Sequence, residues 1–126
     1  MSIREFRFIL PHKNHEAAVA FYRDVLGLAT PESSERGPGT LFRAGPAMIE
    51  VTTPFSPDDP ASELASGSPQ GVTIAIEVER VDEWYEQIKA KRLPIKKALT
   101  NFPWGHRAFS ITDPNGVVVV IFSPIK

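Results

Sequence analysis

Apolar side chains alternate with others over residues 4–10, which is the pattern of a β-strand with two different faces. Phe6, Phe8 and Leu10 share one face of this predicted strand, and Arg7 lies on the other. We expect one face to pack against a helix. The pattern therefore predicts that the chain begins with a strand that is followed by a helix.

The predicted helix has an N-cap at Asn14 and runs to about Leu26, where Gly27 stops it. Its apolar residues recur at the i, i+3, i+4, i+7 spacing of an amphipathic helix: Ala18, Phe21, Tyr22 and Val25. Short strands are predicted to follow near residues 29–34, 39–44 and 46–52.

Residues 54–70 are rich in Pro, Ser, Asp and Gly, so they are interpreted as a surface linker. After the linker the order of elements repeats. A strand is predicted over 71–78, a second helix opens at Asp82 and Glu83, and Leu93-Pro94 ends it. The last predicted strands lie near residues 95–99, 106–112 and 117–123.

The two halves share one plan, in which a strand and a helix precede three strands. The match is visible in the helices, where Phe21 and Tyr22 correspond to Trp84 and Tyr85 at an offset of 63 residues. We interpret these aromatic pairs as core packing. Each half alone would leave a large sheet face open, so the sequence predicts one α+β domain over residues 1–126 with modules at 1–53 and 71–126.

Composition narrows the classes of function. The chain has 126 residues, a net charge of −1 and no cysteine. The charge gives no indication of a nucleic-acid or membrane partner, and the absence of cysteine removes disulfides, thiolate metal sites and cysteine nucleophiles. No stretch has the length and apolarity of a signal or a membrane span, and we expect a cytoplasmic protein.

Two further motifs are more specific. Ala20–Gly27 has the sequence AFYRDVLG, and Trp104–Arg107 precedes the Asp113–Gly116 turn and the apolar run 117–122. Asp-Pro-Asn-Gly predicts a tight turn, because Pro presets φ and Asn-Gly tolerates positive φ. With these motifs the chain resembles the vicinal oxygen chelate superfamily, which includes glyoxalase I, extradiol dioxygenases, fosfomycin-resistance enzymes and bleomycin-resistance proteins. It is most similar to the bleomycin-resistance branch.

The resemblance implies two βαβββ modules whose curved sheets form a cleft, with the helices outside, in a homodimer. In metal-dependent relatives four side chains hold one divalent ion on the cleft floor, and the ion acts as a Lewis acid. The matching positions here are Arg7, Glu50, Thr73 (or its neighbour Val72) and Val120. Arginine and valine cannot coordinate a cation, and Glu50 alone cannot hold one, so we expect no metal and no cofactor.

The same positions favour a binding site for an organic molecule. If Arg7 and Glu50 both face the cleft, the guanidinium replaces the metal charge, and the pair is either part of a ligand site or a structural salt bridge. The apolar side chains Val118, Val120 and Phe122 give that side of the cleft an apolar floor. Such a surface suits an amphipathic ligand.

The histidines and one tryptophan are further candidates. A surface site built from His12, His15 and His106 is conceivable. By alternation His106 shares a face with Ser110, and we expect this face to line the cleft, where His106 acts as a donor or a general base, or has no catalytic task. Trp104 either stacks on a planar ligand or caps the core or a dimer contact.

The leading prediction is a metal-independent protein that binds, and sequesters, a toxic small organic molecule, with no catalytic residue. The alternative is a glyoxalase-, isomerase- or dioxygenase-type enzyme that acts on a vicinal-oxygen substrate. Such an enzyme would have its metal ligands at positions other than the four matched above, or it would use Glu50 and His106 for acid–base catalysis without a metal. A scaffold that binds partners through its sheet edges has no feature in its favour. The predicted ligand-binding residues are Arg7, Glu50, Thr73, Trp104, His106, Ser110 and Val120.

Overall fold

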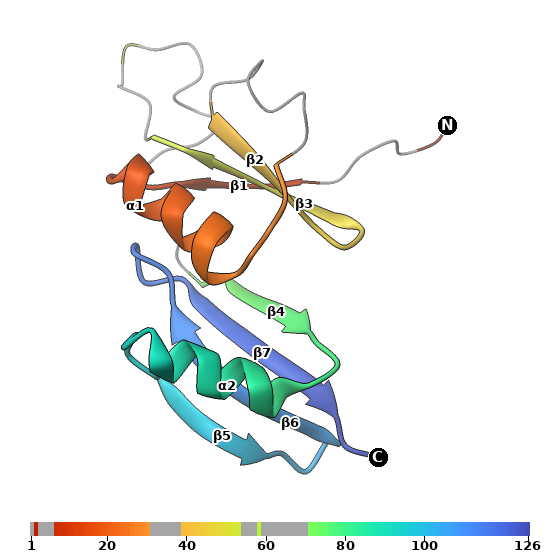
Figure 1. The fold of residues 1–126 in the computed structure, drawn as a ribbon. Coiled ribbons are helices and arrows are strands. Elements are labelled where there is room, and N and C mark those ends of the chain that lie inside the picture. The colour runs from red at the N-terminus through yellow and green to blue at the C-terminus, as the bar shows by residue number, and fades with distance from the viewer. Residues whose placement is uncertain (1, 3–6, 31–38, 54–57, 59–70) are drawn as a thin grey trace. The chain divides into compact units, whose positions relative to one another are not determined.

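The computed structural model describes residues 2, 7–30, 39–53, 58 and 71–126, and the chain divides into two compact units (Figure 1). Unit 1 is Met1–Pro69 and unit 2 is Gln70–Lys126. Most of the predicted linker and of the strand expected near 29–34 lie outside the described residues.

Unit 1 is a mixed sheet with one helical segment. Its elements are β1 (Arg7–Pro11), α1 (His15–Ala20), the π-helical turn η1 (Phe21–Val25), β2 (Gly39–Ala44) and β3 (Ala47–Thr52). The sheet order is β1-β3-β2, in which β1 runs parallel to β3 and β2 runs antiparallel to it. Gly45 connects β2 to β3 with a positive φ of 57°, a conformation that tight hairpin turns require and glycine adopts without strain.

The first helix begins where the sequence predicts. Asn14 is its N-cap, and the side-chain oxygen of Asn14 accepts a hydrogen bond of 3.0 Å from the backbone N–H of Ala17. Gly27 follows the last turn with a φ of 71°, as expected of a glycine that stops a helix.

The last turn of that helix is wider than predicted. In this turn the hydrogen bonds connect residues five apart, as in a π-helix, and not four apart as in an α-helix. The N–H of Leu26 donates to the carbonyl of Phe21 at 3.1 Å. The extra residue rotates the apolar face, and Leu26 is buried while Val25 is only half-buried. The prediction of a regular α-helix with Val25 on its inner face was therefore wrong in this turn.

Unit 2 repeats the plan of unit 1 (Figure 1). Its elements are β4 (Thr73–Glu77), α2 (Val81–Ala90), β5 (Lys97–Asn101), β6 (His106–Thr112) and β7 (Val118–Pro124). The order is β4-β7-β6-β5, and the first strand again runs parallel to the last. In unit 1, Ala29 forms an isolated bridge to Arg43 on β2. Ala29 therefore lies beside β2 where, in unit 2, β5 lies beside the matching strand β6. The predicted internal repeat is confirmed in this topology.

The turn before β7 is also as predicted. The carboxylate oxygen Oδ1 of Asp113 accepts hydrogen bonds of 2.9 Å from the N–H groups of Asn115 and Val117, and Gly116 has a φ of 86°. The predicted end of the second helix at Leu93-Pro94 is later than the observed one. Helix α2 ends at Ala90, after which Arg92 adopts a left-handed φ of 59°.

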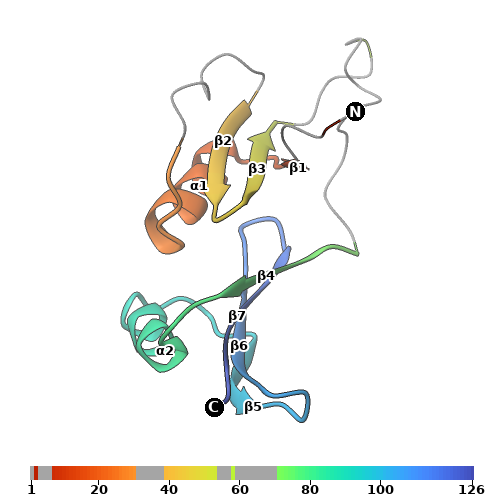
Figure 2. The same cartoon turned by 90° about the vertical axis from the view of Figure 1, so that its right-hand side faces the viewer.

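Each unit packs its helix on one face of its sheet. In unit 1 the rings of Tyr22 and Phe42 lie 5.8 Å apart, and both side chains are fully buried. In unit 2 the rings of Tyr85 and Phe109 lie 5.0 Å apart, and Figure 2 shows α2 beside one face of the sheet. The prediction that the helix aromatics form core is confirmed for Phe21 and Tyr22, which are buried, whereas Trp84 and Tyr85 are only half-buried. No helix among the described residues is long and apolar enough to cross a membrane.

Candidate functional site

The centre of the candidate site in unit 1 is an ion pair between neighbouring strands. The Nη1 atom of Arg7 on β1 donates a hydrogen bond of 3.0 Å to Oε1 of Glu50 on β3. The strand register pairs Ile9 with Glu50, so Arg7 reaches Glu50 along the diagonal, from two residues earlier on the same face. The Glu50 side chain is 5% exposed and that of Arg7 is 32% exposed.

The ion pair lies on the sheet face that the helix of unit 1 does not cover. Tyr22 packs on Phe42, and Phe42 pairs with Ile49 on β3. Because successive side chains of a strand point to opposite faces, Ile49 lies on the helix face and Glu50 on the other. The sequence prediction that Arg7 and Glu50 meet is consistent with this geometry.

Thr52 is a polar residue on this face that the sequence analysis missed. It follows Glu50 by two residues on β3, so the two side chains point the same way. Thr52 is 1% exposed, and its hydroxyl has no hydrogen-bond partner among the residues that the structure describes. The sequence could have indicated this residue, because alternation along the predicted strand puts Thr52 on the same face as Glu50.

Thr73 and Val120 stand in unit 2 in the same relation as Arg7 and Glu50 in unit 1. Val120 on β7 pairs with Ala75 on β4, and Thr73 lies two residues before Ala75. This register favours Thr73 over Val72 as the counterpart of Arg7. Thr73 is exposed and Val120 is half-buried.

Ser110 and His106 extend the same face of unit 2 onto β6. Ser110 pairs with Val120 and is buried. The His106 ring stacks on that of Phe122, with centroids 4.2 Å apart and planes 18° from parallel. Helix α2 covers the opposite face through Phe109. That these residues line a ligand cleft stays a prediction.

Trp104 lies in the turn between β5 and β6. Its ring stacks on Phe102 at a centroid distance of 4.7 Å, and Trp104 is 67% exposed. The turn is fixed by a hydrogen bond of 2.7 Å from the N–H of Phe102 to the carbonyl of His106 and by Gly105 at a φ of 90°. An indole that is so exposed does not cap the core of unit 2.

The histidines of unit 1 do not form the surface site that was considered. His12 is 1% exposed, its Nδ1 lies 3.0 Å from the carbonyl oxygen of Leu10, and its ring meets the edge of Tyr22 at 6.2 Å. His12 lies in the loop between β1 and α1, as expected, but its place in a surface site was predicted wrongly, because the ring is buried against Tyr22. The Nε2 atom of His15 lies 3.1 Å from the hydroxyl of Thr40.

The residues at the inferred metal positions do not fit a divalent ion. Arg7 carries a permanent positive charge, Val120 has no donor atom, and the hydroxyl of Thr73 is a weak ligand. No three His, Asp or Glu side chains within the described ranges gather as a metal site. The carboxylate of Glu50 binds the guanidinium of Arg7 instead.

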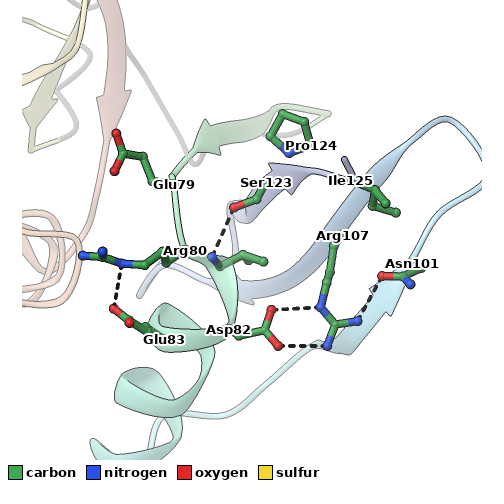
Figure 3. Close-up of a pocket in the computed structure, with 10 residues that line it drawn as sticks. Glu79, Arg80, Asp82, Glu83, Asn101, Arg107, Ser123, Pro124 and Ile125 are labelled. Atoms are coloured by element: carbon green, nitrogen blue, oxygen red, sulfur yellow. Dashed lines mark hydrogen bonds and ion pairs between the residues drawn. The ribbon is translucent and has the colours of Figure 1, made fainter.

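Unit 2 also contains a pocket of about 400 Å³ between the start of α2, the start of β6 and the end of β7 (Figure 3). Arg107 donates from Nε and Nη2 to the two carboxylate oxygens of Asp82 at 2.9 and 3.0 Å, and from Nη1 to Asn101 at 3.0 Å. The hydrogen bond from Arg107 lowers the pKa of Asp82, and Asp82 raises the pKa of Arg107.

This pocket was not predicted from the sequence. Its buried corner is Ser123, whose Oγ accepts from the N–H of Val81 at 3.1 Å and donates to the carbonyl of Val78 at 2.6 Å. The pocket's other ion pair joins Arg80 and Glu83 at 3.1 Å, with both side chains mostly exposed. The Arg107–Asp82 pair and the hydrogen bond from Val81 to Ser123 connect the start of α2 to the sheet, whereas the Arg80–Glu83 pair is local to the start of α2.

The comparisons with known proteins agree with this fold. Among solved structures, the chain is similar to a lactoylglutathione lyase from Agrobacterium tumefaciens (24% identity, TM-score 0.71, covering 97% of this chain and 92% of that one). A protein of unknown function from Agrobacterium tumefaciens str. C58 has 23% identity and a TM-score of 0.76, covering 99% and 97%.

A third similar structure is a member of the glyoxalase/bleomycin resistance protein/dioxygenase superfamily from Sphaerobacter thermophilus DSM 20745 (18% identity, TM-score 0.72, covering 98% of both chains). No curated protein matches the sequence. The family model described as "Glyoxalase/Bleomycin resistance protein/Dioxygenase superfamily" matches residues 6–121. The chain therefore belongs to the glyoxalase/bleomycin resistance protein/dioxygenase superfamily.

Proposed function

We propose that this protein binds a small organic molecule without a metal ion and makes or breaks no bond in it. The proposal places the protein with the bleomycin-resistance branch of its superfamily, as a cytoplasmic homodimer that sequesters a toxic compound. The observation that carries it is the hydrogen bond of 3.0 Å between Arg7 and Glu50. This bond engages the one carboxylate that remains at the four metal-ligand positions.

The positive charge of Arg7 explains why a metal ion would bind poorly beside Glu50. A divalent ion near Glu50 would meet the permanent charge of Arg7 and would find a single carboxylate, whereas catalytic zinc sites typically have three protein ligands. A charge-assisted hydrogen bond contributes about 1.5–3 kcal/mol, and the buried position of Glu50 shields the bond from water. Arg7 therefore serves as the fixed cation of the site.

Unit 2, taken by itself, has an apolar surface on the uncovered face of its sheet that suits an organic ligand. Val118, Val120 and Phe122 are half-buried on this face, and Ser110 adds a hydroxyl. Binding sites for small molecules are mostly apolar with a few placed polar groups. Trp104 supports the proposal because an exposed indole offers a surface on which a planar ligand can stack.

Two measurements test the proposal. Metal analysis of the purified protein is expected to find far less than one equivalent of any divalent ion. A thermal-shift screen of natural products is expected to find compounds that raise the melting temperature of the wild type. A near-stoichiometric metal that is lost in Glu50→Gln would instead support the rival function, a metal-dependent enzyme of the glyoxalase type.

A further inference from the structure

Glu50 and Thr52 form a pair of buried polar side chains on one face of β3. Glu50 is 4% exposed and Thr52 is 1% exposed. Arg7 donates a hydrogen bond to Oε1 of Glu50, and a carboxylate can accept further hydrogen bonds at its second oxygen. The Thr52 hydroxyl is buried and has no hydrogen-bond partner among the residues that the structure describes. Thr52 thus keeps unused hydrogen-bonding capacity next to a carboxylate.

A glycine on the next strand leaves room for the methyl group of Thr52. Gly39 on β2 pairs with Thr52, and a Cβ atom at Gly39 would lie 2.7 Å from the methyl carbon of Thr52. Real Cβ atoms essentially never come so close, so the absence of a side chain at Gly39 makes room for this methyl group. With the methyl group on the Gly39 side, the hydroxyl of Thr52 takes a different position on the same face.

A buried hydroxyl without a partner destabilises a protein, and valine has the same shape without this cost. Met48 on the same face of β3 is buried and apolar. Solvent exposure of this face therefore does not explain the polar side chains at Glu50 and Thr52. Thr40 on β2 provides the contrast, because its hydroxyl lies 3.1 Å from Nε2 of His15. A buried hydroxyl without a partner calls for an explanation, and a ligand that supplies the missing hydrogen bond provides one.

We propose that Glu50 and Thr52 together recognise a hydrogen-bond donor of the ligand, namely a hydroxyl, an amine or a ring N–H. A carboxylate only accepts hydrogen bonds, and a threonine hydroxyl can accept one as well. A metal ion binds the lone pairs of ligand oxygens, so the ligand chemistry proposed here is the opposite. This inference rests on the proposed function, since it names the class of ligand that the same site takes.

Matched pairs of small compounds test the inference without knowledge of the natural ligand. The pairs are phenol and anisole, catechol and its dimethyl ether, and indole and 1-methylindole, in which a methyl group replaces the hydrogen of each donor. Binding to the full chain is followed by NMR titration of backbone amides and threonine methyl groups. We expect each donor compound to shift the Thr52 signals and to bind at least about tenfold more tightly than its methylated partner.

Three variants locate the preference. Thr52→Val is expected to raise the melting temperature of the free protein and to abolish most of the donor preference. Glu50→Gln is expected to reduce the same preference. Thr40→Val is the control: it loses the contact with His15, so it should lower the melting temperature and leave the preference unchanged.

The outcomes separate this inference from the proposed function. Equal binding of donors and their methylated partners contradicts the inference alone, and so does a preference that survives in both Thr52→Val and Glu50→Gln. If no compound of the set binds, the result counts against both. A preference that is present in the wild type and lost in Thr52→Val supports both.

Discussion

Arg7 donates its 3.0 Å hydrogen bond to Glu50 across two parallel strands, although the register places Met48 directly opposite Arg7. The long guanidinium side chain follows the diagonal of the sheet face to reach the buried carboxylate. The pair therefore depends on the parallel register of β1 and β3. Removing either partner should lower the stability of the protein.

A double-mutant cycle measures that dependence. Arg7→Met should lower the free energy of unfolding by about 1–3 kcal/mol, because Glu50 then stays buried without its partner. Arg7→Met combined with Glu50→Gln should cost clearly less than the two single changes added together. Urea denaturation at neutral pH provides the values.

Arg43→Met is the matched control for this cycle. Arg43 pairs with Met48 in the register and is exposed, so the substitution should change stability by less than about 0.5 kcal/mol. Strict additivity of the Arg7 and Glu50 substitutions would show that the hydrogen bond contributes nothing in solution.

The ion pair between Arg107 and Asp82 predicts a specific titration. Arg107→Met removes the hydrogen bond that lowers the pKa of Asp82, so this pKa should rise toward its ordinary value of 3.8. The direct measurement is a carbon-detected NMR titration of the Asp82 carboxyl group.

The sign of the effect on stability follows from linkage. A carboxyl group whose pKa is lowered on folding stabilises the protein above its ordinary pKa, and this contribution is lost as the pH falls through the lowered value. Wild type and Arg107→Met should therefore differ most near neutral pH and converge in acid. A carboxyl pKa that does not move in the variant would refute the assigned cause.

Trp104 should matter for ligands more than for folding. Trp104→Ala should lower the free energy of unfolding by no more than about 1 kcal/mol, since the side chain is 67% exposed and loses mainly its stacking on Phe102. Tryptophan emission should respond to a binding compound in the wild type and lose that response in Trp104→Ala. Trp84→Phe, which removes the chain's other tryptophan, should keep the response.

Local sequence patterns predicted most of the fold. Alternation fitted β6, the apolar run after the turn located β7 closely, Asn14 and Gly27 marked the ends of the first helix, and Asp113–Gly116 formed the expected turn. These features depend on neighbours in the sequence, which is why a single chain reveals them. The repeat of the two units was visible for the same reason.

The features that were missed depend on contacts between distant residues. The burial of His12 under Tyr22 and the link from Arg107 to Asp82 are set by packing between elements that the sequence does not order in space. The wide turn before Leu26 buries Leu26 in place of Val25, and this choice is set by packing of the helix on the sheet. The unpaired hydroxyl of Thr52 is visible only once β2 and β3 are in register.

The most direct test of the account is the metal affinity of the wild type, compared with a variant of unit 1 in which a metal ligand stands beside Glu50. Arg7→His provides this variant, because it replaces the guanidinium that bonds Glu50 with an imidazole that can bind a metal. Calorimetric titration with zinc and nickel should show no binding to the wild type and measurable binding to Arg7→His. Binding of about one equivalent to the wild type, abolished by Glu50→Gln, would contradict the claim that Arg7 has replaced the metal.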